Sequence, residues 1–521
     1  MKYALGSNEM KAVDRYTIET IGIPSCVLME KAAMAVVRHT KELCSEQDRI
    51  LAVCGYGNNG GDGIAAARIL YMEGYQVAIA MVGDAARMTE ETKRQLAIAE
   101  KIGLPMIRKI DFKEYTVIID GIFGIGLTRP VEGEFRAIIE AVNRAEKKVI
   151  SIDIPSGVSA DNGRVLGVAV KAAVTVTFGY QKIGCLLYPG AEYSGKVIVE
   201  DIGFVKDVPV ADYKQFYFTE TPEELLPERR KNSHKGTYGK VLVIAGSKHM
   251  SGAAFFSAAA AYRMGAGLVQ VLTAAENREI LLKQLPEAIV TTYEAEEAGL
   301  LEEDRKRVAE AVSWAGVIVL GPGLGTSAAS AWLVEYVLQN CRVPLIIDAD
   351  GLNLVAAMIS EQLPQEAAPS ERVRCLAGML PEKTILTPHK KELAALTGIP
   401  MANLVECLID SSALCTYNNE LIYVKKDVRT LVAYKDSCYI NVTGNDGMAT
   451  AGSGDVLAGM IAGIVAQGAE PEHAARTGVY LHGMAGDVAA GRLGTRAMLA
   501  GDILDAIPVV LTGSREEPER S

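Results

Sequence analysis

Short apolar runs that alternate with helical stretches are the feature that most constrains the fold of this chain. In the first half, such runs predict strands at residues 50–54, 77–82, 117–120, 148–153, 174–178 and 196–200. In the second half, they predict strands at residues 241–245, 268–272, 317–320, 345–347 and 384–386. This alternation is typical of a mostly parallel sheet covered by helices, so we expect an α/β fold in both halves. A helical segment is expected at 8–44, and short antiparallel strands are expected near 421–442, before helices to the end.

Two domains are expected, because 521 residues exceed what one ordinary hydrophobic core supports. The charged, proline-bearing stretch 220–235 is interpreted as a linker, which predicts domains at residues 1–219 and 236–521. The two halves share no sequence repeat and should therefore differ in structure. We expect the first to be a Rossmann-like αβα sandwich.

Charge and composition exclude several classes of function. The net charge of −11 disfavours a nucleic acid or an anionic membrane as partner. No apolar run reaches the roughly 18 residues of a membrane helix, and the amino terminus lacks an apolar signal core. The nine cysteines contain no C-x-x-C pair, which fits reduced thiols. We therefore expect a cytoplasmic enzyme that acts on small molecules.

The segment 445–455 places a glycine-bearing turn and a carboxylate directly before an apolar helix at 456–465. Backbone N–H groups of Ala451 to Gly454 can converge there on an anion, where the helix dipole adds positive charge. Asp455 can then act as a base that activates a hydroxyl for attack on a nucleotide's terminal phosphoryl group. The alternative is a purely structural helix start, with Ser453 as its cap.

A second glycine-rich turn lies in the first half, between a predicted strand and a predicted helix. Gly55-x-Gly57-x-x-Gly60 superficially matches a dinucleotide fingerprint, with Asp84 near the position of a ribose ligand. However, Asn58, Asn59 and Asp62 put polar side chains where a pyrophosphate would normally meet bare backbone. The turn at 55–63 is therefore expected to recognise something else.

Two later strand ends should meet the same crevice, because the carboxyl ends of parallel strands converge in an open sheet. Asp120 follows one of these strands, and Asp153 and Ser156 follow the next. Asn59, Asp120 and Ser156 could supply oxygen ligands to a monovalent or hard cation. Ordinary turn chemistry is the alternative for each residue taken singly.

The motifs of both halves together resemble one known family. Those of the first half are Gly57-Asn-Asn-Gly-Gly-Asp-Gly63, Asp120 with Phe123-Gly-x-Gly-Leu127, and Asp153-x-Pro-Ser-Gly157. Those of the second half are His234-Lys-Gly-x-Tyr-Gly-Lys240, Gly265-Ala-Gly-Leu268, Gly321-Pro-Gly-Leu-Gly325, Asp348-Ala-Asp-Gly-Leu-Asn353, Thr387-Pro-His389 and Gly444-Asn-x-Gly-Met-Ala-x-x-Gly-Ser-Gly-Asp455. They are similar to the epimerase half and the ribokinase-like dehydratase half of the bifunctional NAD(P)H-hydrate repair enzymes, in the family's order.

This resemblance implies two activities and their site residues. Asp153 would be the acid/base of an NAD(P)H-hydrate epimerase, and Asp455 the base of an ADP- or ATP-dependent dehydratase. The first domain would bind hydrate through Asn58, Asn59, Gly60, Gly61, Asp62, Gly124, Ile125, Gly126, Leu127, Thr128, Arg129, Pro130 and Asp153. It would bind potassium through Asn59, Asp120 and Ser156. The second would bind hydrate through Ala253, Gly323, His389 and Asp455. It would bind the nucleotide, with Mg²⁺, through Lys425, Lys426, Asp427, Val428, Arg429, Asn445, Asp446, Gly447, Met448, Ala449, Thr450, Ala451, Gly452, Ser453 and Gly454. A homo-oligomer is also expected.

The chemistry agrees with the resemblance. Water added across a reduced nicotinamide ring leaves a hydroxyl beside the ring nitrogen, and phosphorylation turns that poor leaving group into a good one. The same carbon is configurationally labile, so an epimerase recovers the epimer that a stereospecific dehydratase leaves behind.

The chain departs from the family pattern at three places. Lys426 stands where a glycine is expected, Ala451 replaces a glycine, and two lysines follow His389. The extra lysines can form a solvated face or bind phosphate, and the Cβ of Ala451 disfavours a positive φ. Two other functions stay open: a vitamin or sugar kinase fused to a Rossmann-like module, and a first domain that is a non-enzymatic binding or scaffold module.

Overall fold

The computed structural model describes residues 1–206, 208–209, 213–294, 299–410, 412–418 and 420–513. The chain divides into two compact units, one formed by residues 3–215 and the other by residues 1–2 with 216–521. Residues 220–235, interpreted from the sequence as a linker, fall in the second unit. They include helix α8 (Pro222–Leu225), whose Leu225 is buried.

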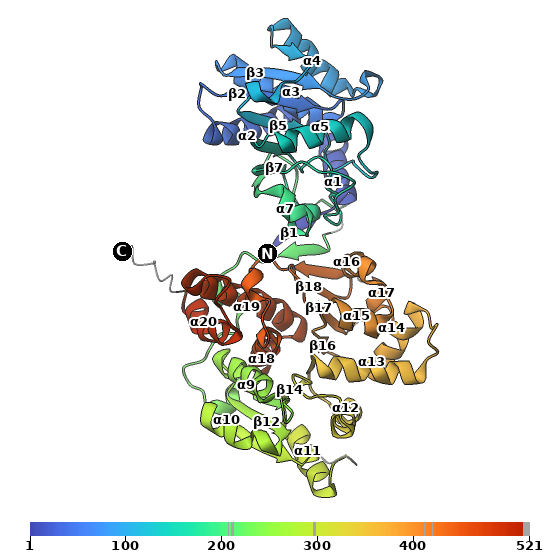
Figure 1. Cartoon of the computed structure of the whole chain (residues 1–521), viewed down its shortest axis with the longest axis vertical. Helices are drawn as coiled ribbons and strands as arrows, with labels where there is room; N and C mark the ends of the chain where they lie inside the picture. Colours follow the sequence, from blue (N-terminus) through green and yellow to red (C-terminus); the bar gives the residue numbers. More distant parts are fainter. Residues whose placement is uncertain (207, 210–212, 295–298, 411, 419, 514–521) are drawn as a thin grey trace. The chain divides into compact units, whose positions relative to one another are not determined.

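The N-terminal unit is built on a seven-stranded sheet of order β4-β3-β2-β5-β6-β7-β9, parallel throughout (Figure 1). Its strands are β2 (Arg49–Cys54), β3 (Gln76–Met81), β4 (Met106–Ile107), β5 (Val117–Gly121), β6 (Lys148–Ile152), β7 (Val174–Phe178) and β9 (Lys196–Glu200). The six strands predicted from apolar runs are confirmed, with ends shifted by at most one residue. Outside this sheet, β1 (Lys2–Leu5) pairs in parallel with the short β8 (Gln181–Lys182).

Successive residues of a strand point to opposite faces of the sheet, so the apolar strands of this unit present buried side chains on both faces. Helices cover both of these faces. Ile50, Ala52 and Cys54 of β2 pack with helices α2 (Ser25–Leu43) and α3 (Asn58–Met72). Leu51 and Val53 pack on the other face, with α5 (Gly133–Arg144). The remaining helices of the unit are α1 (Ser7–Arg15), α4 (Glu90–Lys101), α6 (Ile183–Leu186) and α7 (Gly190–Ser194).

Two sequence predictions in this unit need correction. The helical segment expected at 8–44 is interrupted after α1 and a π-helical turn (Tyr16–Thr20), because Gly22 takes a φ of 90° and Pro24 precedes α2. The turn expected at 55–63 is shorter than predicted, since α3 already begins at Asn58. The polar residues Asn58, Asn59 and Asp62 therefore lie in the first helical turns.

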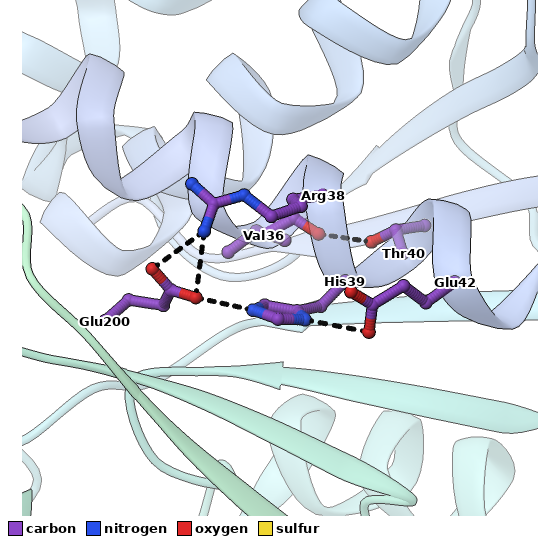
Figure 2. A network of polar contacts seen from close by, with 6 residues as sticks. All are labelled: Val36, Arg38, His39, Thr40, Glu42 and Glu200. Carbon is purple, nitrogen blue, oxygen red and sulfur yellow. Dashed lines mark hydrogen bonds and ion pairs between the residues drawn. The ribbon is translucent and has the colours of Figure 1, made fainter.

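A charged network ties α2 to the end of β9 (Figure 2). His39 is buried between two carboxylates: its Nε2 lies 2.6 Å from Glu200 Oε1 and its Nδ1 lies 3.0 Å from Glu42 Oε2. Arg38 donates to both oxygens of Glu200 at 3.1 Å. Burial alone would lower the pKa of His39, but the two carboxylates outweigh it and raise that pKa.

The C-terminal unit contains the sheet order β13-β12-β11-β14-β15-β16-β17-β18-β19. Pairing is parallel from β13 to β17 and antiparallel from β17 to β19, so the predicted change of pattern after residue 421 is confirmed. The strands are β11 (Lys240–Ile244), β12 (Leu268–Ala274), β13 (Ile289–Tyr293), β14 (Val317–Leu320), β15 (Leu345–Ile347), β16 (Thr384–Leu386), β17 (Ile422–Lys425), β18 (Leu431–Tyr434) and β19 (Ser437–Ile440). Strand β13 was not predicted.

The unit's helices lie between and after these strands. They are α9 (Ser251–Arg263), α10 (Arg278–Gln284), α11 (Glu302–Trp314), α12 (Ala328–Asn340), α13 (Asp350–Gln362), α14 (Pro369–Met379), α15 (Lys390–Thr397), α16 (Leu404–Ile409), α17 (Ser412–Cys415), α18 (Ser453–Ala466), α19 (Pro471–Leu493) and α20 (Ala500–Thr512). Across the described ranges, no single helix is long and apolar enough to cross a membrane; only the segments 390–397 and 401–409 meet that test jointly, with a 106° bend between them.

Helices α9 and α18 touch through their backbones at a glycine seam formed by Gly459 and Gly463 of α18. A Cβ at Gly459 would lie 2.1 Å from the carbonyl oxygen of Ser257, and one at Gly463 would lie 2.7 Å from that of Ala261. The Ser257 hydroxyl also donates to the carbonyl oxygen of Asp455 at 3.1 Å. The contacts at Ser257 thus fix the start of α18 against the middle of α9.

Candidate active sites

The N-terminal unit contains a cavity of about 860 Å³ above the carboxyl ends of its central strands. Its walls come from the start of α3, the segment after β5 and the end of β6, together with α1 and α2. The lining includes the predicted residues Asn58, Asn59, Asp62, Gly124, Ile125, Gly126, Leu127, Thr128, Arg129 and Asp153. Asp84 also lines the cavity, where its carboxylate caps a short 3₁₀ turn. A volume of this size accommodates a substantial part of a nucleotide-sized ligand.

Three predicted substrate-binding residues do not line this cavity. Gly60 and Gly61 are buried beneath it, where a Cβ at Gly60 would lie 1.8 Å from the carbonyl oxygen of Gly55. Gly60 is therefore required by close backbone approach, whatever the ligand. Pro130 follows the lining segment and is not part of the wall.

Asp153 is held rigidly at the end of β6. Its backbone φ is 66°, a left-handed conformation that is unusual for a residue with a side chain. Its Oδ1 accepts hydrogen bonds from Thr177 Oγ1 at 3.1 Å and from the amide of Phe178 at 3.3 Å. The Lys182 ammonium, which is fully buried, lies 2.6 Å from the same oxygen. No sequence motif singled out Lys182, which reaches Asp153 only through the fold.

Among the other carboxyl groups that line this cavity, Asp14 of α1 and Asp62 of α3 interact with Asp153. Burial and the negative charge of Asp153 raise the pKa of Asp14. Burial, with the charges of Asp153 and Asp14, raises the pKa of Asp62 well above its usual value. Asp14 was missed by sequence reasoning because it lies on α1, far from any motif. The cavity therefore holds the Asp153–Lys182 ion pair beside two carboxyl groups whose pKa values are raised.

The three predicted cation ligands lie close together. Asp120 is 1% exposed and accepts from Ser156 Oγ at 2.5 Å, the Ser156 amide at 2.9 Å and Ser151 Oγ at 2.8 Å. Burial raises the pKa of Asp120, and these hydrogen bonds oppose the shift. A Cβ at Gly124 would lie 3.2 Å from Asn59 Oδ1, which places Asn59 against the segment after β5. In the described part of the chain, the buried Asn59 Nδ2 has no hydrogen-bond partner.

The glycine-bearing turn of the C-terminal unit leads directly into the buried helix α18. The positive φ of the turn, 89°, falls on Gly452, whereas Ala451 is not among the described residues with positive φ. The substitution at position 451 therefore causes no strain. Ser453 is the first helical residue, and the cap is Gly452, so the prediction of Ser453 as the helix cap is wrong. Its hydroxyl lies 3.4 Å from the Nε2 of buried His482.

Asp487 of α19 anchors the beginning of this turn. Its carboxylate accepts from the amide of Gly444 at 2.9 Å and from the side chain of Asn445 at 3.0 Å. The Asn445 Oδ1 in turn caps the short 3₁₀ helix Asp446–Met448 by accepting from the Gly447 amide at 3.0 Å. Asp487 lies in the middle of a long helix, where sequence alone gave no sign of this role.

Asp455 follows the turn as the third residue of α18. Burial and the neighbouring Asp348 and Asp350 raise the pKa of Asp455 to about 6, although Lys426 opposes the shift. A pKa of about 6 leaves the carboxylate mostly ionised at neutral pH yet basic enough to accept a proton. This is the electrostatic state that a general base requires.

Besides Asp455, the predicted hydrate-binding residues of this unit are Ala253 in α9, Gly323 after β14 and His389 before α15. Gly323 and Ala253 adjoin, since a Cβ at Gly323 would lie 2.7 Å from that of Ala253. His389 is the N-cap of α15: its Nδ1 accepts from the amide of Glu392 at 3.1 Å. His389 also forms a parallel bridge with Lys426. His389 is thus a structural cap whose side chain stays 52% exposed.

Lys390 and Lys426, which depart from the family pattern, have different partners, and Lys425 shares the partner of Lys390. Lys425 and Lys390 both bind Asp427 Oδ2, at 2.6 and 2.8 Å. Lys426 instead binds Asp348 Oδ1 at 2.5 Å. Arg429 donates to the carbonyl oxygen of Val442 at 3.0 Å, while Val428 is exposed.

Together the units define a two-part α/β enzyme. One part contains a cavity lined by carboxylates, and the other contains a glycine-bearing turn followed by the partly buried Asp455. Residues 241–509 match the NAD(P)H-hydrate dehydratase family, and residues 25–184 match the family of YjeF-related protein N-termini. The chain is 35% identical to a bifunctional NAD(P)H-hydrate repair enzyme of Moorella thermoacetica, over 99% of this chain and 98% of that protein. It is also 35% identical to the enzyme of that name from Thermofilum pendens, over 98% and 97%.

The chain belongs to the family of bifunctional NAD(P)H-hydrate repair enzymes, as its motifs predicted. Among solved structures, the ADP/ATP-dependent NAD(P)H-hydrate dehydratase of Bacillus subtilis, co-crystallised with ATP and Mg²⁺, is 30% identical. The match covers 56% of this chain and 97% of the Bacillus subtilis chain, with a TM-score of 0.45. A ribokinase-like superfamily protein of Enterococcus faecalis is 28% identical, covering 57% and 96%, with a TM-score of 0.49.

Proposed function

We propose that the N-terminal unit interconverts the R and S epimers of NADH and NADPH hydrates, and that the C-terminal unit dehydrates the S epimer at the expense of ADP or ATP. The observation that carries the proposal is the setting of Asp455, a partly buried carboxylate with a pKa of about 6 that directly follows the glycine-bearing turn at the start of α18. Asp153, in a cavity lined by the predicted hydrate-binding residues, supports the first activity.

Epimerisation would open and reclose the hydrated ring. Asp153 takes the proton of the hydroxyl, the bond between that carbon and the ring nitrogen breaks, and an aldehyde forms. The nitrogen gains a proton, for which the cavity offers Asp62, a carboxyl group whose pKa is raised well above its usual value by burial and by the charges of Asp153 and Asp14. Rotation and attack of the nitrogen on the other face of the aldehyde give the opposite epimer, with each proton returned. The buried Lys182 holds the Asp153 carboxylate in place throughout.

Asn59, Asp120 and Ser156 would hold a potassium ion beside this cavity. One carboxylate, one hydroxyl and one amide are oxygen donors that suit a hard monovalent cation. Because an amide can be turned to exchange its oxygen and nitrogen, the unpaired end of Asn59 offers an oxygen ligand. When bound, the ion would supply a fixed positive charge next to the start of α3.

Dehydration would begin when Asp455 takes the proton of the hydrate hydroxyl. The hydroxyl oxygen forms a bond to the terminal phosphorus, and the bond from that phosphorus to the remaining nucleotide breaks, leaving AMP from ADP or ADP from ATP. The ring nitrogen then donates its electron pair, the carbon–oxygen bond breaks, and inorganic phosphate leaves. Loss of a proton from the adjacent ring carbon restores the reduced nicotinamide.

Mg²⁺ would enter this site with the nucleotide. In the resolved ranges given above, no group of three or more His, Cys, Asp or Glu side chains is arranged to hold a metal ion. Mg²⁺ is commonly bound through substrate phosphates and only one or two carboxylates, which this site provides.

The test uses the purified full chain with mixed epimers of NADH hydrate and either ADP or ATP. Recovery of the dihydronicotinamide absorbance beyond the S fraction is expected, because epimerisation feeds dehydration. Recovery that stops at the S fraction would refute the epimerase activity, and no recovery with either nucleotide would refute the dehydratase. Replacing NADH hydrate with NADPH hydrate measures the preference between the two.

A further inference from the structure

Lys426 places a positive charge at the centre of the dehydratase site. Its ammonium lies 2.5 Å from Oδ1 of Asp348, which is 1% exposed at the end of β15. Its backbone amide donates to the carbonyl oxygen of Pro388 at 2.8 Å, beside the parallel bridge to His389. Lys426 is therefore fixed at both ends, and its side chain does not extend into solvent as a lysine on a solvated face would.

The same ammonium abuts the anion-binding turn. A Cβ at Gly454 would lie 3.1 Å from Lys426 Nζ and 3.4 Å from Asp348 Oδ2. The ammonium thus lies between the buried Asp348 carboxylate and the turn whose backbone N–H groups would meet the phosphates in the proposed dehydratase. Lys425 points elsewhere, to Asp427 at 2.6 Å, because successive residues of an extended strand face opposite sides. Of the two lysines, Lys426 is the one whose ammonium adjoins Gly454.

The charge balance of the site requires this cation. Asp348, Glu392 and Asp455 all interact electrostatically with Lys426. A phosphoryl group that enters next to Asp348, Asp350 and Asp455 meets negative charges on one side. Phosphoryl transfer is catalysed mainly by positive groups placed around the group in transit. The ammonium against Gly454 is the side-chain cation nearest to that position among the contacts described above.

We propose that the Lys426 ammonium contacts the phosphoryl group as it passes from the nucleotide to the hydrate, and that it keeps Asp455 in its basic form. This inference rests on the proposed dehydratase function. During transfer the oxygen–phosphorus bond to the hydrate forms, the bond to the nucleotide breaks, and the hydroxyl proton goes to Asp455. Lys426 keeps its own proton throughout and acts only through its charge.

The test compares Lys426→Met, Lys426→Arg and a control, Lys306→Met, which makes the same change on the exposed face of α11. We expect Lys426→Met to lower kcat for dehydration by about 100-fold or more, the usual cost of removing one charge-stabilising group. It should weaken binding of ADP or ATP more than binding of AMP. The acid limb of its pH profile should move to higher pH, because Asp348, Asp350 and burial then act on Asp455 without the opposing cation. Lys426→Arg should keep the acid limb near its original position, and the control should behave as the parent.

A role limited to supporting Asp348 would leave the acid limb unmoved and would affect AMP, ADP and ATP alike; either result overturns the proposal. Unchanged kcat in Lys426→Met overturns it as well. If Lys426→Met fails to fold, as judged by its thermal transition, Lys426→Gln is measured against the same outcomes. Failure of the proposed function itself is distinguishable, since the parent chain would then form no dihydronicotinamide with either nucleotide.

Discussion

Replacing Asp455 with asparagine should abolish most of the dehydratase activity while sparing the nucleotide site. The change keeps the side-chain shape and the backbone of the turn, so ADP and ATP should bind nearly as well as before. A neutral amide cannot accept the hydroxyl proton, and general-base catalysis is typically worth 10²–10⁴-fold. We therefore expect kcat at pH 7 to fall at least ~100-fold, about 2.7 kcal/mol of transition-state stabilisation.

The raised pKa of Asp455 makes this loss depend on pH in a calculable way. With a pKa of about 6, the carboxylate is roughly nine-tenths ionised at pH 7 and about one-tenth ionised at pH 5. The parent rate should therefore fall about tenfold between these values, while the residual rate of Asp455→Asn has no such limb. The ratio of the two rates should shrink from about 100 at pH 7 to about 10 at pH 5.

The assay follows dihydronicotinamide recovery from S hydrate at saturating nucleotide, with nucleotide affinity measured separately by calorimetry. Asp436→Asn, the same change in the exposed turn between β18 and β19, is the matched control. Epimerisation should be unaffected, because its residues lie in the other unit. Near-parent turnover, or a rate ratio that is constant with pH, would remove Asp455 from the role of base, and loss of both activities would indicate misfolding.

Three further outcomes are expected. Asp153→Asn replaces the carboxylate with a residue that also tolerates a positive φ. Given mixed epimers and nucleotide, this variant should dehydrate the S hydrate quickly and then stall. A progress curve that reaches completion at the parent's rate would exclude Asp153 as the acid/base. Potassium should raise the Tm of the parent relative to choline at equal ionic strength, and at 100 times its Kd it should add about 2.7 kcal/mol to the free energy of unfolding. Ser156→Ala should lose this effect. An equal shift in that variant would locate the potassium effect elsewhere. Because the pKa of His39 is raised in the folded state, its stabilising contribution is complete below about pH 6.5 and is lost as pH rises through the folded value. His39→Gln should therefore lower Tm more at pH 6 than at pH 9, and a pH-independent loss would contradict this assignment.

The sequence predicted the strands well because buried parallel strands are continuous apolar runs. β2, β5, β6 and β7 are buried along almost their whole length, and each was found to within a residue. β13 was missed because it is an edge strand: only its last residue, Tyr293, is buried. Its sequence, Ile-Val-Thr-Thr-Tyr, lacks the uniform apolar character on which the prediction relied.

The candidate sites were predicted only as far as their residues lie in motifs. Asp153 and Asp455 follow glycine- or proline-bearing turns, which have a local signature. Asp14, Lys182 and Asp487 have none, because each reaches its site from an ordinary helix or a two-residue strand. Their proximity depends on tertiary packing between elements distant in sequence. Spacing along the chain carries no information about such contacts.

The backbone contact of α9 and α18 at Gly459 and Gly463 links evolutionary change in the core to change in catalysis. A methyl group at either position would overlap a carbonyl oxygen of α9, so the helices would have to separate. Ala253 and Asp455 stand at the starts of these two helices and would move apart with them. A substitution at this contact is therefore expected to lower turnover, although both glycines lie in the helical core. A mutational survey of the chain would score both positions as catalytic, and only measurements of folding stability would reveal that they are part of the core.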